Sequence, residues 1–165
     1  MAEVAFRLGI IGAGGISGAH VGAAKASNGR IVVVSVADPV EKNRNTVAEA
    51  NGAQAFASGE AMLAAHESGK TPLDGVVVCT PPFARLKIIE AALRRKVPVL
   101  SEKPLAHTLA EARKIAFLSA RNRKVPFFVA YCHRFAPAIN EMNRMVAQGK
   151  IGRLVRFENF FACDL

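Results

Sequence analysis

Tryptophan, tyrosine and cysteine are scarce in this sequence. It has no tryptophan, one tyrosine and three cysteines among 165 residues. The cysteines, Cys79, Cys132 and Cys163, are odd in number and irregularly spaced, which predicts reduced thiols and no disulfide framework. Cys132 is followed by His133, but neighbours on a strand point to opposite faces, so we expect no metal site.

Long apolar runs are also missing. No stretch approaches the ~20 uninterrupted apolar residues that a membrane helix needs. The apolar run near the N-terminus follows Glu3 and is interrupted by glycines, which indicates a buried strand and not a signal peptide. We therefore expect a cytoplasmic protein that does not bind a membrane.

The positive charge is unevenly distributed. The net charge is +9, and charged residues make up 21% of the chain, which is typical of a globular protein. Most of the excess lies after residue 84, in basic runs such as 94–96 and 121–124 at the ends of predicted helices, where cations suit the helix dipole. Attraction of an anionic ligand is an alternative. We expect no nucleic acid partner, because no aromatic residues interleave with these charges.

Predicted strands and helices alternate along the chain. The strands are expected at 5–11, 31–37, 54–56, 75–79, 97–100 and 126–131, and the helices at 15–27, 40–50, 59–67, 84–95, 108–122 and 136–148. This alternation predicts an α/β fold with a doubly wound parallel sheet of the Rossmann type, over residues 1–150.

The C-terminal segment does not fit that repeat. Residues 151–161 alternate in the manner of a strand and carry a phenylalanine-rich face. A strand of this kind needs a partner. We expect association through this strand, with a copy of the chain in a homo-oligomer or with a separate second half.

A glycine motif follows the first predicted strand. Gly12, Gly14 and Ser17 occupy the three positions of the G-x-G-x-x-G pattern, with serine in place of the third glycine. A strand before it and a helix after it are the context in which this pattern binds a dinucleotide pyrophosphate. Gly15 and Ile16, which lead into the helix, are expected to bind the cofactor as well.

An acidic residue ends the second predicted strand. Asp38 lies 24 residues after Gly14, where a carboxylate can bind the adenosine ribose hydroxyls and disfavour a 2′-phosphate. The cofactor is therefore NAD or NADP, with NAD favoured. Alternatively, Asp38 only caps the next helix, and Arg44 in that helix could reach a phosphate.

Thr80, Pro81 and Pro82 follow the fourth predicted strand. Carboxyl ends of parallel strands line the ligand crevice, so these three residues are expected to flank the cofactor. A simple strand terminator is the alternative, because proline restricts the residue before it to extended conformations.

Charged residues follow the fifth and sixth predicted strands. Lys103 is the candidate catalytic residue and a cofactor contact, because a crevice lysine can bind a substrate hydroxyl. Glu102 is expected to orient Lys103 or to contact ribose. His133 and Arg134 are further candidate cofactor contacts, whereas His20 is interpreted as an ordinary helix residue.

The sequence resembles the N-terminal domain of the glucose–fructose oxidoreductase/inositol dehydrogenase (Gfo/Idh/MocA) family over nearly its whole length. The matching segments are 9–17 with His20, 36–38, 80–82, 102–106, 133–135 with Pro137, and 149–154. The resemblance implies a Rossmann fold that binds NAD or NADP. It also implies that Lys103 contacts the substrate hydroxyl and that Pro104 follows a cis peptide bond.

Two departures from the family stand out. Arg85 occupies a position where family members often have histidine, and the chain has about half the residues that two typical domains require. In the family, the second domain supplies the substrate pocket, a catalytic residue and usually the dimer face. The resemblance implies that residues 151–165 are the first strand of this domain, truncated in this chain.

We therefore expect the cofactor-binding domain of an NAD(P)-dependent oxidoreductase. Its reaction would be hydride transfer between nicotinamide and a small sugar- or polyol-like alcohol or aldehyde, with an incomplete active site in this chain alone. The alternative is a non-catalytic nucleotide-binding or regulatory module that uses the glycine motif but not Lys103.

Overall fold

The computed structural model describes residues 4–158 and residue 160. The chain forms two compact units, residues 1–130 and 131–165, and each is described by itself. The domain boundary that we expect between residues 150 and 151 is not tested by this division and stays a prediction.

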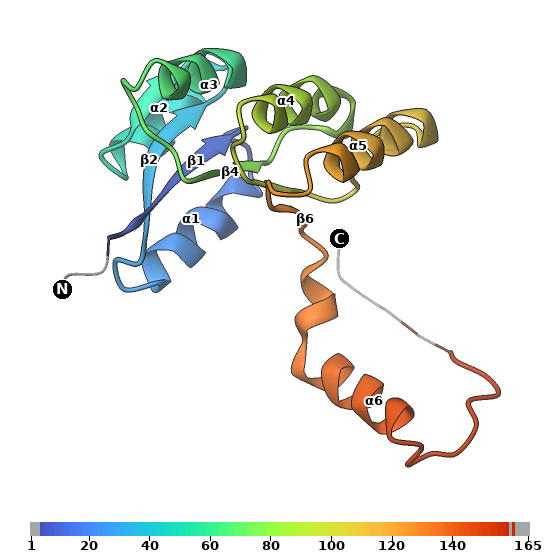
Figure 1. The fold of residues 1–165 in the computed structure, drawn as a ribbon. Coiled ribbons are helices and arrows are strands. Elements are labelled where there is room, and N and C mark those ends of the chain that lie inside the picture. The colour runs from blue at the N-terminus through green and yellow to red at the C-terminus, as the bar shows by residue number, and fades with distance from the viewer. Residues whose placement is uncertain (1–3, 159, 161–165) are drawn as a thin grey trace. The chain divides into compact units, whose positions relative to one another are not determined.

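A six-stranded parallel sheet forms the first unit (Figure 1). Its strands are β1 (Phe6–Ile11), β2 (Ile31–Ala37), β3 (Gln54–Phe56), β4 (Gly75–Val78), β5 (Val99–Ser101) and β6 (Phe127–Val129). They lie in the order β3-β2-β1-β4-β5-β6, with every neighbouring pair parallel. This order reverses between β1 and β4, which confirms the predicted doubly wound fold and places a ligand crevice at that point.

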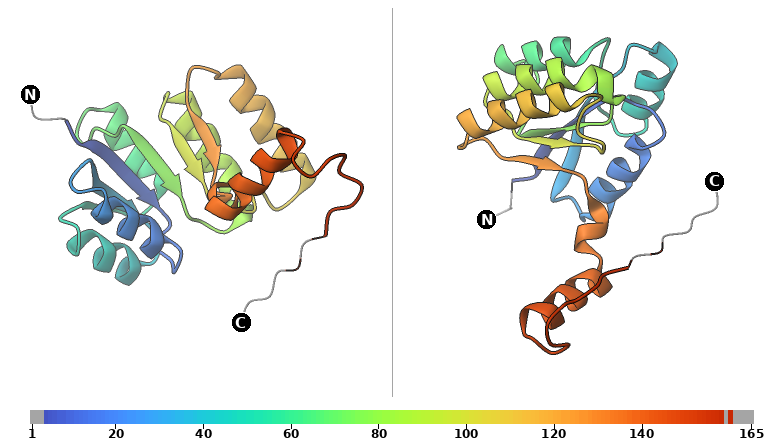
Figure 2. Two further views of the ribbon diagram at one scale, coloured as in Figure 1. Left: turned by 90° about the horizontal axis from the view of Figure 1, so that it is seen from below. Right: turned by 90° about the vertical axis from the view of Figure 1, so that its right-hand side faces the viewer.

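Five helices connect these strands. They are α1 (Ser17–Ala26), α2 (Glu41–Glu49), α3 (Gly59–Glu67), α4 (Pro82–Arg94) and α5 (Leu109–Arg121). Figure 2 shows α1 on the opposite side of the sheet from α4 and α5. The predicted capping box starts α5: the Thr108 side chain accepts a hydrogen bond from the Glu111 backbone, and the Glu111 side chain accepts one from the Thr108 backbone.

Each face of the sheet has its own apolar core. Ile11, Leu63 and Ile89 belong to the core beneath α3, α4 and α5, whereas Ile10 and Val21 belong to the core beneath α1 and α2. Every residue of β4 is buried, as a strand covered on both faces should be.

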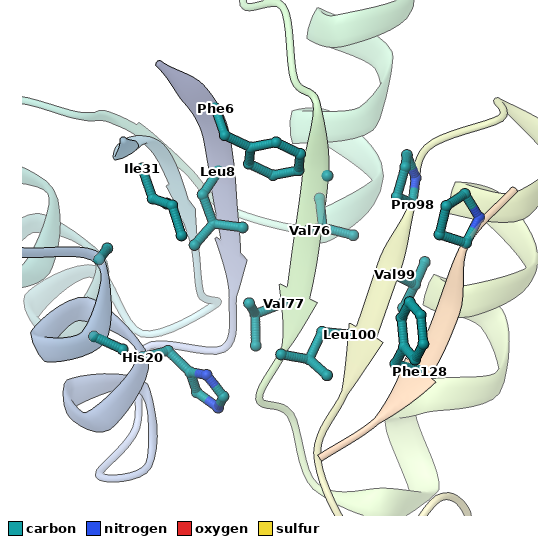
Figure 3. A pocket seen from close by; sticks show the side chains of 14 residues that line it. Phe6, Leu8, His20, Ile31, Val76, Val77, Pro98, Val99, Leu100 and Phe128 are labelled. Carbon is teal, nitrogen blue, oxygen red and sulfur yellow. The ribbon is translucent and has the colours of Figure 1, made fainter. Parts of the chain in front are cut away.

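An apolar groove lies beside α1 on the sheet (Figure 3). Its volume is about 410 Å³, and β1, β4, β5 and β6 each contribute side chains to it, among them Leu8, Val77, Leu100 and Phe128. His20 of α1 closes one end of the groove in this view.

The second unit contains a short 3-10 helix, η1 (Cys132–Phe135), and α6 (Pro137–Ala147). Residues 151–158, where a strand was predicted, have no regular secondary structure, and the rest of that predicted strand lies largely outside the described residues. A strand needs a neighbour for its backbone hydrogen bonds, and none of the six described strands pairs with this segment. None of the helices described here has the length and apolarity needed to cross a membrane.

Candidate functional site

A cleft of about 1020 Å³ lies at the carboxyl ends of β1, β2 and β4. Polar main-chain and side-chain groups from three separate loops line it. The sequence-predicted residues among its lining are Gly12, Gly14, Gly15, Ile16, Asp38, Thr80 and Pro81. The fold therefore brings seven of the twelve predicted site residues to one cavity.

Gly12 makes the turn that leads from β1 into the cleft. Its φ is +97°, and a Cβ atom there would lie 2.8 Å from backbone atoms of Cys79 and Thr80. Gly14 and Gly15 are different, because a Cβ on either would meet no atom within 4 Å. Gly12 is thus required by the fold, whereas Gly14 and Gly15 leave open space through which a ligand can approach the backbone.

The start of α1 points free N–H groups toward this space. Within the described chain, the N–H groups of Gly14, Gly15 and Ile16 have no protein acceptor, and no side chain caps the helix. Ser17 replaces the third glycine of the pattern without disturbing the turn, since it is buried and its hydroxyl donates to the Gly14 carbonyl at 2.6 Å. A helix N-terminus of this kind suits a phosphate group.

The Asp38 carboxylate is held by two backbone N–H groups, and its predicted contact with ribose stays a prediction. Its Oδ2 accepts a hydrogen bond from the Ala13 N–H, and its Oδ1 accepts one from the Val40 N–H, each at 2.8 Å. The first bond ties the end of β2 to the glycine turn, and the second supports the start of α2. The carboxylate still lines the cleft.

Arg44 lies near Asp38, on α2. Its Nη1 lies 3.3 Å from the Pro39 carbonyl oxygen and 3.5 Å from that of Asp38, and its Nη2 lies 3.7 Å from a Glu41 carboxylate oxygen. Its side chain is 18% exposed. The guanidinium therefore has hydrogen-bond and charge partners within the protein.

The Thr80-Pro81-Pro82 segment divides between the cleft and the helix that follows. Thr80 and Pro81 line the cleft, whereas Pro82 is the first residue of α4, where a missing N–H costs no hydrogen bond. Thr80 Oγ1 is one of two buried side-chain oxygens without a hydrogen-bond partner among the described residues. A buried unpaired hydroxyl beside a cleft is a group that a ligand can satisfy.

Glu102 has a buried carboxylate with two protein partners. Its Oε1 lies 2.9 Å from His20 Nε2, and its Oε2 accepts a hydrogen bond from the Lys103 backbone N–H at 3.0 Å. Glu102 therefore contacts the lysine backbone, and its expected role toward the Lys103 side chain or ribose stays a prediction. His20 was interpreted as an ordinary helix residue. Its position one turn after Ser17, at the start of the helix that follows the glycine motif, could have predicted that it lies near the site.

Lys103 is exposed and lies two residues after the end of β5. The peptide bond between Lys103 and Pro104 is cis, as the family resemblance implied. Glu102, Lys103 and Pro82 do not belong to the lining of the cleft described above. Lys103 thus lies beyond the cleft, at the end of β5, the strand next to β4.

Arg85 is buried in α4 and belongs to the lining of the cleft. Its Nε donates to the Thr80 carbonyl at 2.8 Å, and its Nη atoms donate to the carbonyls of Glu102, Pro104 and Lys103. Burial lowers the pKa of Arg85, while the negative charge of Glu102 acts in the opposite direction. Arg85 was recognised as a departure from the family, but none of these contacts was predicted.

His133 and Arg134 belong to η1 in the second unit. Their expected contacts with the cofactor therefore stay a prediction, since the two units are described separately.

Comparison with known proteins identifies the family. The sequence pattern described as "Oxidoreductase family, NAD-binding Rossmann fold" (GFO_IDH_MocA) matches residues 6–131. The chain belongs to the Gfo/Idh/MocA oxidoreductase family. The matched range contains the sheet and the complete cleft of the first unit, so the first unit is the family's NAD-binding Rossmann domain.

Individual relatives agree with this assignment. The rhizopine catabolism protein MocA of Rhizobium meliloti is 34% identical over 149 residues, which are 90% of this chain and 44% of that protein. Inositol 2-dehydrogenase of Rubrobacter xylanophilus is 27% identical over 153 residues, 93% of this chain and 43% of that enzyme. The chain thus spans less than half the length of these relatives.

A solved structure shares the fold. The WlbA dehydrogenase from Bordetella pertussis, determined in complex with NADH and UDP-GlcNAcA, matches with a TM-score of 0.82 and 25% identity. The match covers 91% of this chain and 43% of that one.

Proposed function

We propose that this chain is the cofactor-binding part of an NAD(P)-dependent oxidoreductase that acts on a sugar- or polyol-like alcohol or aldehyde. The observation that carries the proposal is the convergence of the glycine turn, the free N–H groups before α1 and the Asp38 carboxylate on one cleft. These groups are complementary to a pyrophosphate and a ribose, the two parts that every nicotinamide dinucleotide contains.

NAD is the favoured cofactor. Asp38 is held in place by two backbone N–H groups, so its negative charge stays at the end of β2, where it would repel a 2′-phosphate. Arg44, the cation that could offset this repulsion, already contacts two backbone carbonyls and Glu41. Both observations support a preference for a free ribose hydroxyl.

Lys103 has the substrate role in this proposal. A bound nicotinamide supplies the carbon that accepts or donates the hydride. The Lys103 ammonium would donate a hydrogen bond to the reacting oxygen of the substrate, and Glu102 would keep the lysine backbone at the strand end. The rest of the substrate pocket is expected from residues outside this chain, as the length of the relatives suggests.

Titration with NADH and NADPH, followed by nicotinamide fluorescence, tests the cofactor proposal. We expect saturable binding of NADH, tighter than that of NADPH by at least ~10-fold. Asp38→Asn should reduce this ratio, whereas the control Glu49→Gln, which removes an exposed carboxylate from the far end of α2, should not. Failure of the wild-type chain to bind either cofactor would overturn the proposal.

Lys103→Ala separates the oxidoreductase from a non-catalytic nucleotide-binding module. Both functions predict that this variant still binds NADH. Only the oxidoreductase predicts that a polyol shifts the fluorescence of NADH bound to the wild-type chain and that Lys103→Ala weakens this effect. The polyol is supplied at high concentration, because the rest of its pocket is expected outside this chain.

A further inference from the structure

We propose that Arg85 is a positioning residue that fixes the backbone from Glu102 to Pro104 and thereby the place of the Lys103 side chain. The inference rests on the proposed function for the role of Lys103. The position of the segment itself depends only on contacts within the first unit, and it can be tested without substrate.

The contacts of Arg85 converge on this one segment. Three consecutive carbonyl oxygens, those of Glu102, Lys103 and Pro104, accept hydrogen bonds from its Nη atoms. The Nε–H donates to the Thr80 carbonyl at the end of β4. One side chain thus links the segments that follow two adjacent strands. It donates hydrogen bonds to the carbonyl of Lys103 and to those of the residues on either side.

Arginine is suited to this arrangement. Its guanidinium has five N–H donors in a rigid plane, whereas lysine offers one point charge on a flexible stem. The side chain is buried, and in the described part of the chain its hydrogen-bond acceptors are all main-chain carbonyl oxygens. Moving this segment away from the guanidinium would cost free energy, because each broken hydrogen bond leaves a buried charged donor unsatisfied.

Glu102 and His20 hold the same segment by a separate set of contacts. The Glu102 carboxylate accepts the Lys103 backbone N–H, while His20 of α1 binds its other oxygen. The carbonyl groups of the segment are therefore fixed by Arg85 and its N–H group by Glu102. Because both its carbonyl and its N–H groups are hydrogen-bonded, the backbone at Lys103 is held in place, and only the Lys103 side chain is free to change its conformation.

Arg95 provides a matched control. It lies at the end of α4, with 10% of its side chain exposed, and binds Glu60, Glu67 and the Ala91 carbonyl, far along the helix from Arg85. Loss of Arg95 removes a well-bonded guanidinium from the same helix without touching residues 102–104.

Hydrogen–deuterium exchange on the full chain tests the proposal. In Arg85→Gln, peptides that cover residues 101–108 should exchange at least ~10-fold faster, with smaller changes elsewhere, and Arg85→Lys should restore part of the protection. Arg95→Gln should leave this region unchanged. Unaltered exchange at 101–108 in Arg85→Gln, or equal acceleration there in Arg95→Gln, would overturn the proposal.

A second readout reports on the lysine itself. After reductive ¹³C-methylation, the Lys103 resonance, assigned through Lys103→Arg, should shift in Arg85→Gln and keep its position in Arg95→Gln. If Arg85→Gln does not fold, the Arg85 Nη–H resonances of the wild-type chain decide the matter. Slow solvent exchange supports the hydrogen bonds to residues 102–104, and exchange as fast as that of an exposed arginine refutes them. NADH titration of the wild-type chain runs in parallel, so failure of the proposed function is seen separately.

Discussion

The guanidinium of Arg7 holds the carboxylate of Asp74 through two parallel hydrogen bonds, 2.9 Å from Nε to Oδ2 and 2.7 Å from Nη2 to Oδ1. The Arg7 backbone N–H donates to the same carboxylate, and the Asp74 N–H donates to the Arg7 carbonyl. This pair joins the start of β1 to Asp74, the residue before β4. β1 and β4 are the two strands that flank the ligand crevice. The Arg7 hydrogen bonds lower the pKa of Asp74 to about 2.

Asp74→Asn should therefore destabilise the chain at neutral pH and reduce its sensitivity to acid. Because the folded pKa of Asp74 is depressed, its contribution is complete above the unfolded value of about 3.9 and is lost as the pH falls toward 2. Urea unfolding at intervals from pH 7 to pH 2 measures this, and the stability difference between variant and wild type should shrink across that range. High salt should also reduce it, since 43% of the Arg7 side chain is exposed.

Glu90→Gln is the control for Asp74→Asn. Glu90 pairs with Lys114 at 3.4 Å on the surface, and the two side chains are 43% and 52% exposed. Such pairs contribute little, so this variant should unfold like the wild type. A difference between Asp74→Asn and wild type that stays constant down to pH 2 would contradict the assignment of the acid response to Asp74.

Cys79 and Cys132 should differ sharply in reactivity. Burial, together with the charge of Glu102, raises the pKa of Cys79 to about 12, so its thiol stays protonated at neutral pH. Cys132 is exposed. Iodoacetamide at pH 8, read out by peptide mass spectrometry, should modify Cys132 within minutes and Cys79 only after denaturation. Cys132→Ser shows the labelling of Cys79 when Cys132 is absent. Equal labelling of both thiols in the native chain would contradict this expectation.

The local pattern of the sequence was enough to predict the elements of the sheet. The run of β-branched residues at 31–37 is β2 with the same bounds, and the capping box at Thr108 begins α5 as expected. Where the bounds differ, the cause is local as well. Helix α4 begins at Pro82, two residues before the predicted start, because proline at the first helical position needs no hydrogen bond.

The contacts at the site were harder to predict, since they depend on strand order. His20 and Glu102 are 82 residues apart and meet only because the β1 and β5 strands flank β4. Arg85 was visible in the sequence as an unusual residue, but its acceptors are backbone carbonyls, which carry no sequence signal. The predicted C-terminal strand is not formed over residues 151–158 for the opposite reason: the alternating pattern is present, but the described chain offers it no neighbouring strand. Its place in a second domain stays a prediction.

The His20–Glu102 hydrogen bond should show measurable coupling. Glu102 keeps only 7% of its side chain exposed, so His20→Ala leaves a buried carboxylate oxygen without a partner and should cost about 1–3 kcal/mol. Glu102→Gln removes the charge, and the double variant should be more stable than the sum of the single effects predicts. A double-mutant cycle from urea unfolding gives this coupling energy directly. Strict additivity would mean that the two side chains do not interact in solution.

Gly12 and Gly22 offer a matched pair for testing the turn that opens the cleft. Alanine at Gly12 would place a Cβ 2.8 Å from backbone atoms of Cys79 and Thr80, at a φ of +97°, so the turn or the end of β4 must move. We expect Gly12→Ala to destabilise the chain by about 2 kcal/mol or more and to abolish NADH binding.

Gly22 lies on the exposed side of α1, and a Cβ there meets nothing within 4 Å. Gly22→Ala should therefore stabilise the chain by up to about 1 kcal/mol through helix propensity and leave NADH binding intact. Thermal unfolding and fluorescence titration of both variants separate the two effects. If Gly12→Ala binds NADH with wild-type affinity, the cofactor does not depend on this turn, and the site must be sought elsewhere on the sheet.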